Sequence, residues 1–124
     1  MHGNMTGAYA ISHVAIRNRV VLTNKMPTGL NRGFGGPQVY FALERLVQRI
    51  AVELGLDPLD VIRRNLVPAD AFPYQTATGA IYDSGNYAAA LALAVEDGGL
   101  AELQARRDAA RAEGRFYGLS LIHI

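Results

Sequence analysis

Apolar and polar residues alternate with a helical period between Pro37 and Leu54. The apolar positions, spaced three or four residues apart, are Val39, Leu43, Leu46, Val47, Ile50 and Leu54. Charged and amide residues fill the remaining arc, which is typical of an amphipathic helix. Pro37 suits a first helical turn and Gly55 suits a C-terminal cap, because their backbone preferences match those positions. The pattern therefore predicts a helix that ends before Gly55.

Three shorter helices are predicted further along the chain. Asp57 is a typical N-cap, and Pro58 follows it at the first helical position. The run Asp83-Ser84-Gly85-Asn86 is a similar lead into a helix, and glycines follow the last two predicted helices as stop signals. The predicted segments are about Asp57–Asn65, Tyr87–Val95 and Leu100–Glu113.

Extended structure is predicted at both ends of the chain. β-Branched residues are frequent from Tyr9 to Asn24, which predicts two short strands or one bent strand. Arg115–Ile124 is also β-prone and predicts a C-terminal strand, whereas residues 67–83 hold two prolines and predict irregular or edge-like chain. The predicted fold class is α+β, with short N-terminal strands, a glycine-rich loop, several helices and a C-terminal strand.

The glycine-rich loop, residues 31–37, is the strongest candidate for binding chemistry. Its glycines free the backbone, and the helix start that follows presents unpaired N–H groups to an anion or a polar cofactor edge. The positively charged guanidinium group of Arg32 would add hydrogen-bond donors for such an anion. Phe34, which stands between two glycines, would stack on a planar ligand. Two plainer interpretations stay open: the glycines only make a tight turn, and Phe34 only fills the core. Gln38 stands where the dinucleotide fingerprint needs its third glycine, so that fingerprint is not met.

Composition narrows the classes of function. Lys and Arg number 12 against 11 Asp and Glu, a net charge of +1 that lacks the basic excess typical of nucleic-acid binding. The chain has no cysteine, which excludes disulfides, thiolate metal sites and iron–sulfur ligation within it. His2, His13 and His123 are too dispersed for a metal-ligand set, and no carboxylate pair stands out as an acid–base dyad.

The apolar runs are short. The longest, Tyr87–Val95, has nine residues, whereas a membrane-spanning helix needs about 20. The N-terminal residues also lack the uninterrupted apolar stretch of a signal peptide. We therefore expect a cytoplasmic protein with no membrane partner.

Seven motifs in order along the chain resemble one family. They are Gly7-Ala8-Tyr9, Thr23-Asn24-Lys25, Pro27-Thr28-Gly29, Arg32-Gly33-Phe34-Gly35-Gly36-Pro37-Gln38, Asp57-Pro58, Arg63-Arg64-Asn65-Leu66 and Tyr82-Asp83-Ser84-Gly85-Asn86-Tyr87. They resemble the molybdenum-binding large subunit of the xanthine dehydrogenase, aldehyde oxidase and aerobic carbon monoxide dehydrogenase group. By this resemblance, residues 1–120 are part of a molybdopterin-binding domain, and residues 121–124 are a tail of doubtful origin.

The resemblance implies an oxidoreductase that hydroxylates an aldehyde or an N-heterocycle with water-derived oxygen at a molybdenum–pterin centre. Arg32 and Gly33 match cofactor-binding positions, and Phe34 matches a substrate-binding aromatic. The implied cofactor is molybdenum–molybdopterin, with the cytosine dinucleotide form as one option. Electrons would pass to 2Fe-2S and FAD on partner domains or subunits.

The resemblance also implies an incomplete chain. The family's catalytic glutamate lies far downstream, so no catalytic residue is assigned, and the chain alone is expected to be an inactive internal fragment. Part of its apolar content should then lie on the surface, where absent segments would pack. Asn31 replaces the family's usual aromatic before the arginine, and the cysteine found there in carbon monoxide enzymes is absent, which disfavours that substrate.

Two other classes of function stay open. A non-catalytic module could hold a small anion with the glycine-rich loop and the following helix N-terminus. A weaker option is a subunit-interface piece, suggested by the alanine-rich segment Tyr87–Val95.

Overall fold

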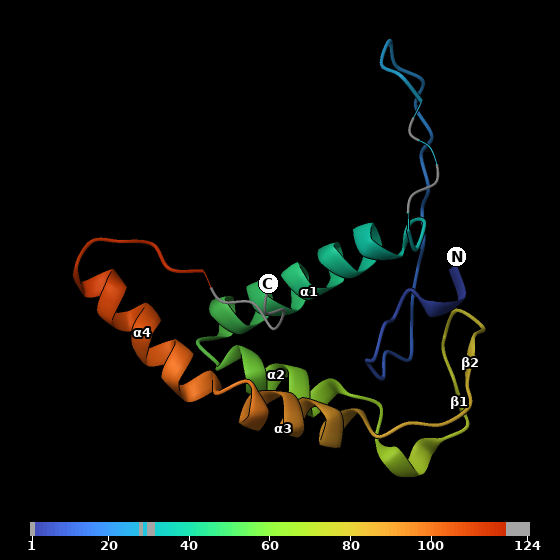
Figure 1. Cartoon of the computed structure of the whole chain (residues 1–124). Coiled ribbons are helices and arrows are strands. Elements are labelled where there is room, and N and C mark those ends of the chain that lie inside the picture. The colour runs from blue at the N-terminus through green and yellow to red at the C-terminus, as the bar shows by residue number, and fades with distance from the viewer. Residues whose placement is uncertain (1, 28, 30–31, 119–124) are drawn as a thin grey trace. The chain divides into compact units, whose positions relative to one another are not determined.

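The computed structural model describes residues 2–27, 29 and 32–118, which divide into two compact units, Met1–Gly85 and Asn86–Ile124. The first unit contains α1 (Gly36–Leu54), α2 (Pro58–Asn65) and the antiparallel strands β1 (Tyr74–Gln75) and β2 (Ile81–Tyr82), with one-turn 3-10 helices at His2–Asn4 and Ala69–Ala71 (Figure 1). The second unit contains α3 (Tyr87–Asp97) and α4 (Leu100–Ala112). No helix in the described part of the chain is both long and apolar enough to cross a membrane.

The ends of the helices follow the local signals in the sequence. Gly35 and Gly55 flank α1 with φ of 79° and 64°, and the Gly55 N–H bonds to carbonyls of the last turn. Asp57 caps α2, because its Oδ1 accepts from the N–H groups of Leu59 at 2.8 Å and Asp60 at 3.1 Å. Asn86 caps α3 by accepting from the Ala89 N–H at 3.0 Å. The four predicted helices are therefore confirmed.

Residues 8–10 pair with the chain that leaves α2. Tyr9 forms an antiparallel bridge with Leu66, supported by bonds from the Ala10 N–H to the Asn65 carbonyl at 2.8 Å and from the Val67 N–H to the Ala8 carbonyl at 2.9 Å. This pairing buries Tyr9 and Val67, which belong to the small core. Among the described residues of the first unit, the other buried apolar residues are Ala51 of α1 and Val61 of α2.

Residues 3–7 lie between α1 and the β1–β2 hairpin. A Cβ on Gly7, whose φ is +57°, would approach Leu43 of α1 to 3.1 Å. On the other side, Thr76 and Thr78 each donate to the Gly3 carbonyl at 2.6 Å. The start of the chain therefore ties the hairpin to α1.

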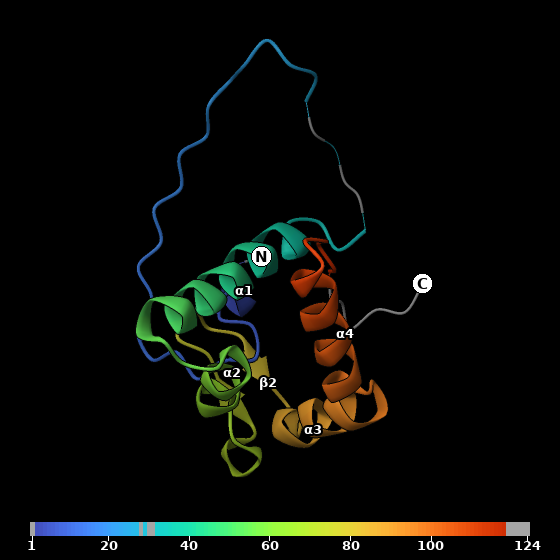
Figure 2. The ribbon, with the colours of Figure 1, turned by 90° about the vertical axis from the view of Figure 1, so that its left-hand side faces the viewer.

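The predicted N-terminal strands are wrong. Apart from the bridge at Tyr9, no strand occurs in the described residues up to 27, and no backbone hydrogen bond joins residues 12–27 to another described residue. We call residues 12–27 the projecting segment, because this exposed chain leaves the body of the first unit in both views (Figures 1 and 2). A strand needs hydrogen bonds from a second segment, and none is supplied here.

The other predicted extended regions also differ from the structure. Residues 115–118 are irregular, so the predicted C-terminal strand does not form there, and residues 119–124 lie outside the described residues. Residues 67–83, predicted to be irregular or edge-like, contain the β1–β2 hairpin, which pairs Tyr74 with Tyr82 and Gln75 with Ile81. The described residues thus form helices plus one small antiparallel sheet.

Much of the predicted apolar stripe of α1 is not covered. Ala51 is its buried residue, whereas Leu46, Ile50 and Leu54 are exposed. The expectation that part of the apolar content lies on the surface is confirmed, since the projecting segment and α1 both expose large apolar side chains.

Candidate functional site

The described part of the glycine-rich loop is a tight turn into α1. Gly33 and Gly35 adopt left-handed conformations, with φ of 75° and 79°, which other L-residues rarely adopt. The Gly36 N–H bonds to the Gly33 carbonyl at 2.9 Å, and the Val39 N–H bonds to the Gly35 carbonyl at 3.1 Å. The glycines therefore make the turn, and they leave the loop surface free of side chains on both sides of Phe34.

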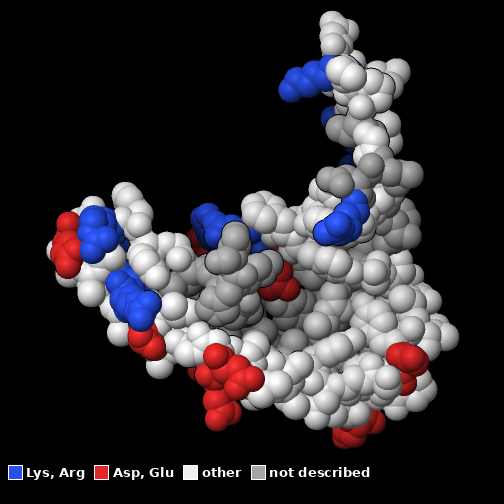
Figure 3. Space-filling model, in the orientation of Figure 1, with Lys and Arg blue, Asp and Glu red and all other residues white. Residues whose placement is uncertain are grey.

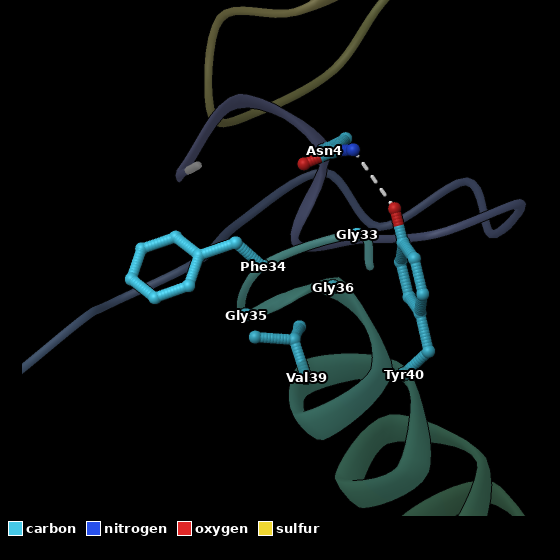
Figure 4. A pocket seen from close by; sticks show the side chains of 7 residues that line it. All are labelled: Asn4, Gly33, Phe34, Gly35, Gly36, Val39 and Tyr40. Atoms are coloured by element: carbon cyan, nitrogen blue, oxygen red, sulfur yellow. Dashed lines mark hydrogen bonds between the residues drawn. The ribbon is translucent and has the colours of Figure 1, made fainter. Parts of the chain in front are cut away.

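The loop borders a hollow of about 300 Å³. Its lining comes from the N-terminal 3-10 helix, the loop and the first turns of α1, as Figure 4 shows. The lining residues are Asn4, Gly33, Phe34, Gly35, Gly36, Val39 and Tyr40. None of them is a carboxylate, a histidine or a lysine, so these residues are suited to binding and orienting a ligand rather than to transferring its protons.

Asn4 and Tyr40 form one side of the hollow. The Asn4 Nδ2 donates to the Tyr40 hydroxyl at 2.8 Å (Figure 4). Sequence reasoning missed both residues. Tyr40 stands four residues after Gly36, so helical spacing places it on the side of the loop, but no local signal connects Asn4 with a residue 36 positions away.

Phe34 lies on the other side of the hollow. Its ring points away from Tyr40 in Figure 4, and 53% of the residue is exposed. The interpretation that Phe34 fills the core is therefore wrong for this structure. The exposed ring has a free face for contact with another planar group.

The predicted site residues are only partly brought together. Gly33 and Phe34 line the hollow, whereas Arg32 is exposed and is not among the lining residues. Asn31, the departure noted before the arginine, lies outside the described residues, as does His123. Among the described residues, no group of three or more His, Cys, Asp or Glu is placed to hold a metal ion.

Charge is distributed unevenly around the site. The first 43 residues contain Arg17, Arg19, Lys25 and Arg32 but no Asp or Glu. Figure 3 shows Lys and Arg, and no Asp or Glu, on the projecting segment. The first carboxylate in the chain is Glu44, in α1. The loop and the segment before it thus favour an anionic partner.

Glu44 is engaged by a buried tyrosine. The Tyr9 hydroxyl donates to Glu44 Oε2 at 2.8 Å, and only 3% of Tyr9 is exposed. Burial, and then the hydrogen bond and the negative charge of Glu44, raise the pKa of Tyr9 well above its usual range. Tyr9 therefore remains a neutral donor that links α1 to residues 8–10.

Comparisons with known proteins agree on one family. The family model described as the molybdopterin cofactor-binding domain matches residues 1–66 of this chain. The carbon monoxide dehydrogenase large chain of Afipia carboxidovorans is 32% identical over 84% of this chain and 13% of its own length. A probable xanthine dehydrogenase subunit of Bacillus subtilis is 40% identical over 56% of this chain and 9% of its own length.

A solved structure shows the same similarity in three dimensions. Quinoline 2-oxidoreductase from Pseudomonas putida 86 matches with a TM-score of 0.79 at 33% sequence identity. The match covers 90% of this chain and 14% of that chain. The chain thus spans less than a fifth of the length of these similar proteins.

Proposed function

Because the chain belongs to the molybdopterin cofactor-binding domain family, we propose that it is an internal piece of the large subunit of a molybdenum hydroxylase. The observation that carries this proposal is the family match over residues 1–66, since these residues include the glycine-rich loop and all seven residues that line the hollow. The family's enzymes are molybdenum-dependent oxidoreductases. The proposed role of this piece is to form one wall of the cofactor and substrate site.

The residues of the loop fit the cofactor that the family binds. Gly33 and Gly35 adopt a conformation that favours glycine, and because glycine has no side chain, a large ligand can approach the main chain closely there. Arg32 is exposed beside this surface and supplies a cation suited to an anionic group. We propose that Arg32 and Gly33 hold the molybdopterin. When bound, the molybdenum centre supplies the two-electron oxidation of a substrate carbon with oxygen from water.

The proposed substrate is an aldehyde or an N-heterocycle. Phe34 presents an exposed ring at the hollow, and stacking of aromatic rings favours planar substrates. Quinoline, named in the similar solved structure, belongs to the class of N-heterocycles. The absence of a cysteine before Arg32 disfavours carbon monoxide. The role proposed for Phe34 is to orient the substrate by ring contact.

Electron transfer from the molybdenum centre needs redox groups that other parts of the enzyme would hold. Because the chain has no cysteine, an iron–sulfur cluster would be held elsewhere. We propose 2Fe-2S and FAD partners, on other domains or subunits, together with the remainder of the large subunit. The cytosine dinucleotide form of the cofactor and a cytoplasmic location also belong to this proposal. The alternative of a self-contained anion-binding module finds no support in the comparisons.

Arg32→Ala in the full-length large subunit tests the cofactor site. We expect lower molybdenum and pterin content per subunit, measured by metal analysis and by pterin fluorescence after release. Arg45→Ala is the matched control, because Arg45 is an exposed arginine of α1 whose Nη1 donates to Gln48 on the same helix. Unchanged molybdenum content in the Arg32 variant would contradict the role of Arg32. Full-length protein without any molybdenum would contradict the proposed function.

A further inference from the structure

Two of the described residues that line the hollow beside the glycine-rich loop have polar side chains, and these side chains are bonded to each other. Of the seven described lining residues, only Asn4 and Tyr40 carry nitrogen or oxygen in their side chains, since the others are glycines, Phe34 and Val39. The Asn4 Nδ2 donates to the Tyr40 hydroxyl at 2.8 Å (Figure 4). Polar recognition by these side chains therefore depends on one pair.

The direction of this hydrogen bond leaves the Tyr40 proton for a ligand. A tyrosine hydroxyl both accepts and donates hydrogen bonds. Here it accepts from Asn4, and within the described part of the chain no group accepts its proton. A hydroxyl that accepts a hydrogen bond is also a stronger donor, because successive bonds polarise one another. Tyr40 is 36% exposed and lines the hollow, so a ligand there can reach the hydroxyl.

The backbone holds both members of the pair in place. Gly7 and Gly36 lie along opposite edges of the Tyr40 ring: a Cβ on Gly36 would be 3.5 Å from Tyr40 Cε2, and a Cβ on Gly7 would be 3.9 Å from Tyr40 Cδ1. The Gly7 N–H also donates to the Asn4 carbonyl at 3.0 Å, which fixes the turn that carries Asn4. A donor that is held in advance loses little conformational freedom when it binds a ligand.

On these observations, and resting on the proposed function, we infer that the Tyr40 hydroxyl donates a hydrogen bond to the substrate and that Asn4 is the positioning residue that directs this donor. The two proposed substrate classes share the required acceptor, since an aldehyde has a carbonyl oxygen and an N-heterocycle has a ring nitrogen. Phe34, on the other side of the hollow, contacts planar rings through its own ring and supplies no hydrogen bond (Figure 4). Tyr40 therefore selects substrates that carry an acceptor over hydrocarbons of the same shape.

Binding of quinoline and naphthalene to the full-length large subunit, within its assembled enzyme, tests the inference. The two molecules have the same fused-ring shape, but only quinoline has a ring nitrogen that accepts a hydrogen bond. Equilibrium dialysis without an electron acceptor, so that turnover does not consume the probe, measures the dissociation constant of each. We expect Tyr40→Phe to lower the affinity for quinoline about 5-fold and to leave the affinity for naphthalene unchanged.

Three results would overturn the inference. The first is a wild-type enzyme that does not bind quinoline, and the second is a ratio of quinoline to naphthalene affinity that is the same in the wild type and in Tyr40→Phe. The third is an equal loss of affinity for both probes, which would give Tyr40 a structural role only. Tyr74→Phe is the matched control, because Tyr74 is not among the lining residues, and it should leave the ratio unchanged.

Asn4→Asp tests the direction of the bond within the pair. Aspartate is nearly the same size as asparagine, but its carboxylate has no N–H and would accept the Tyr40 proton. The affinity for quinoline should therefore fall as it does in Tyr40→Phe, with no change for naphthalene. Unchanged quinoline affinity in Asn4→Asp would overturn the positioning role of Asn4.

Molybdenum analysis of the same wild-type sample separates this inference from the proposed function. Molybdenum present, with an affinity ratio that does not depend on Tyr40, contradicts this inference alone. Quinoline binding that depends on Tyr40, in full-length protein that holds no molybdenum, contradicts the proposed function alone.

Discussion

The hydrogen bond between Tyr9 and Glu44 links residues 8–10 to α1, and Tyr9→Phe removes it while keeping the ring. The hydroxyl lies 2.8 Å from Glu44 Oε2, on a residue that is only 3% exposed. A hydrogen bond to a charged group contributes about 1.5–3 kcal/mol. Glu44 itself is exposed, so water replaces the lost donor and no buried acceptor is left unpaired. We therefore expect a loss of about 1 kcal/mol in the free energy of unfolding.

Urea titration of the chain, followed by far-ultraviolet circular dichroism, measures this loss. Tyr74→Phe is the matched control, because the Tyr74 hydroxyl makes no hydrogen bond to a described residue. A double-mutant cycle with Glu44→Gln isolates the pair, since glutamine keeps an acceptor but loses the charge. Charge-assisted bonds are roughly twice as strong as neutral ones, so Tyr9→Phe should cost about half as much when it is combined with Glu44→Gln. Equal costs with and without Glu44→Gln would refute the assigned interaction.

Three further perturbations test the core, the site and the helix ends. The pKa of Tyr9 is raised in the folded chain, so the protonated hydroxyl stabilises the fold fully below the ordinary tyrosine pKa of about 10, and this stabilisation is lost as the pH rises above that value. In thermal melts, the melting temperature of the wild type should therefore fall more steeply at alkaline pH than that of Tyr9→Phe. Phe34→Ala in the full-length enzyme should weaken the binding of aromatic substrates by about 1 kcal/mol, as measured by inhibitor titration, whereas Phe41→Ala, at an exposed position away from the hollow, should not. Asp57→Ala should destabilise the chain by about 1 kcal/mol in urea titration, while Asp57→Asn, which keeps a capping oxygen, should have little effect.

The candidate site was only partly predictable from the sequence. Gly33 and Phe34 are close in sequence to the start of α1, so a local pattern was enough to single out their loop, and the structure places both residues at the hollow. Asn4 reaches the hollow only because residues 3–7 lie between the hairpin and α1, a packing that involves contacts across more than 30 residues. No local pattern encodes such a contact.

Local hydrogen bonding explains what the sequence alone determined about this protein. The hydrogen bonds of a helix join residues that are four apart, so the residues that cap its ends lie next to it in the sequence. The caps at Gly55, Asp57 and Asn86 could therefore be recognised in the sequence. A strand forms its hydrogen bonds with a second segment, and the sequence of the first segment does not reveal which segment that is. Only the tertiary structure therefore decided that Tyr9 pairs with Leu66, while the equally β-prone residues 12–27 have no strand partner among the described residues.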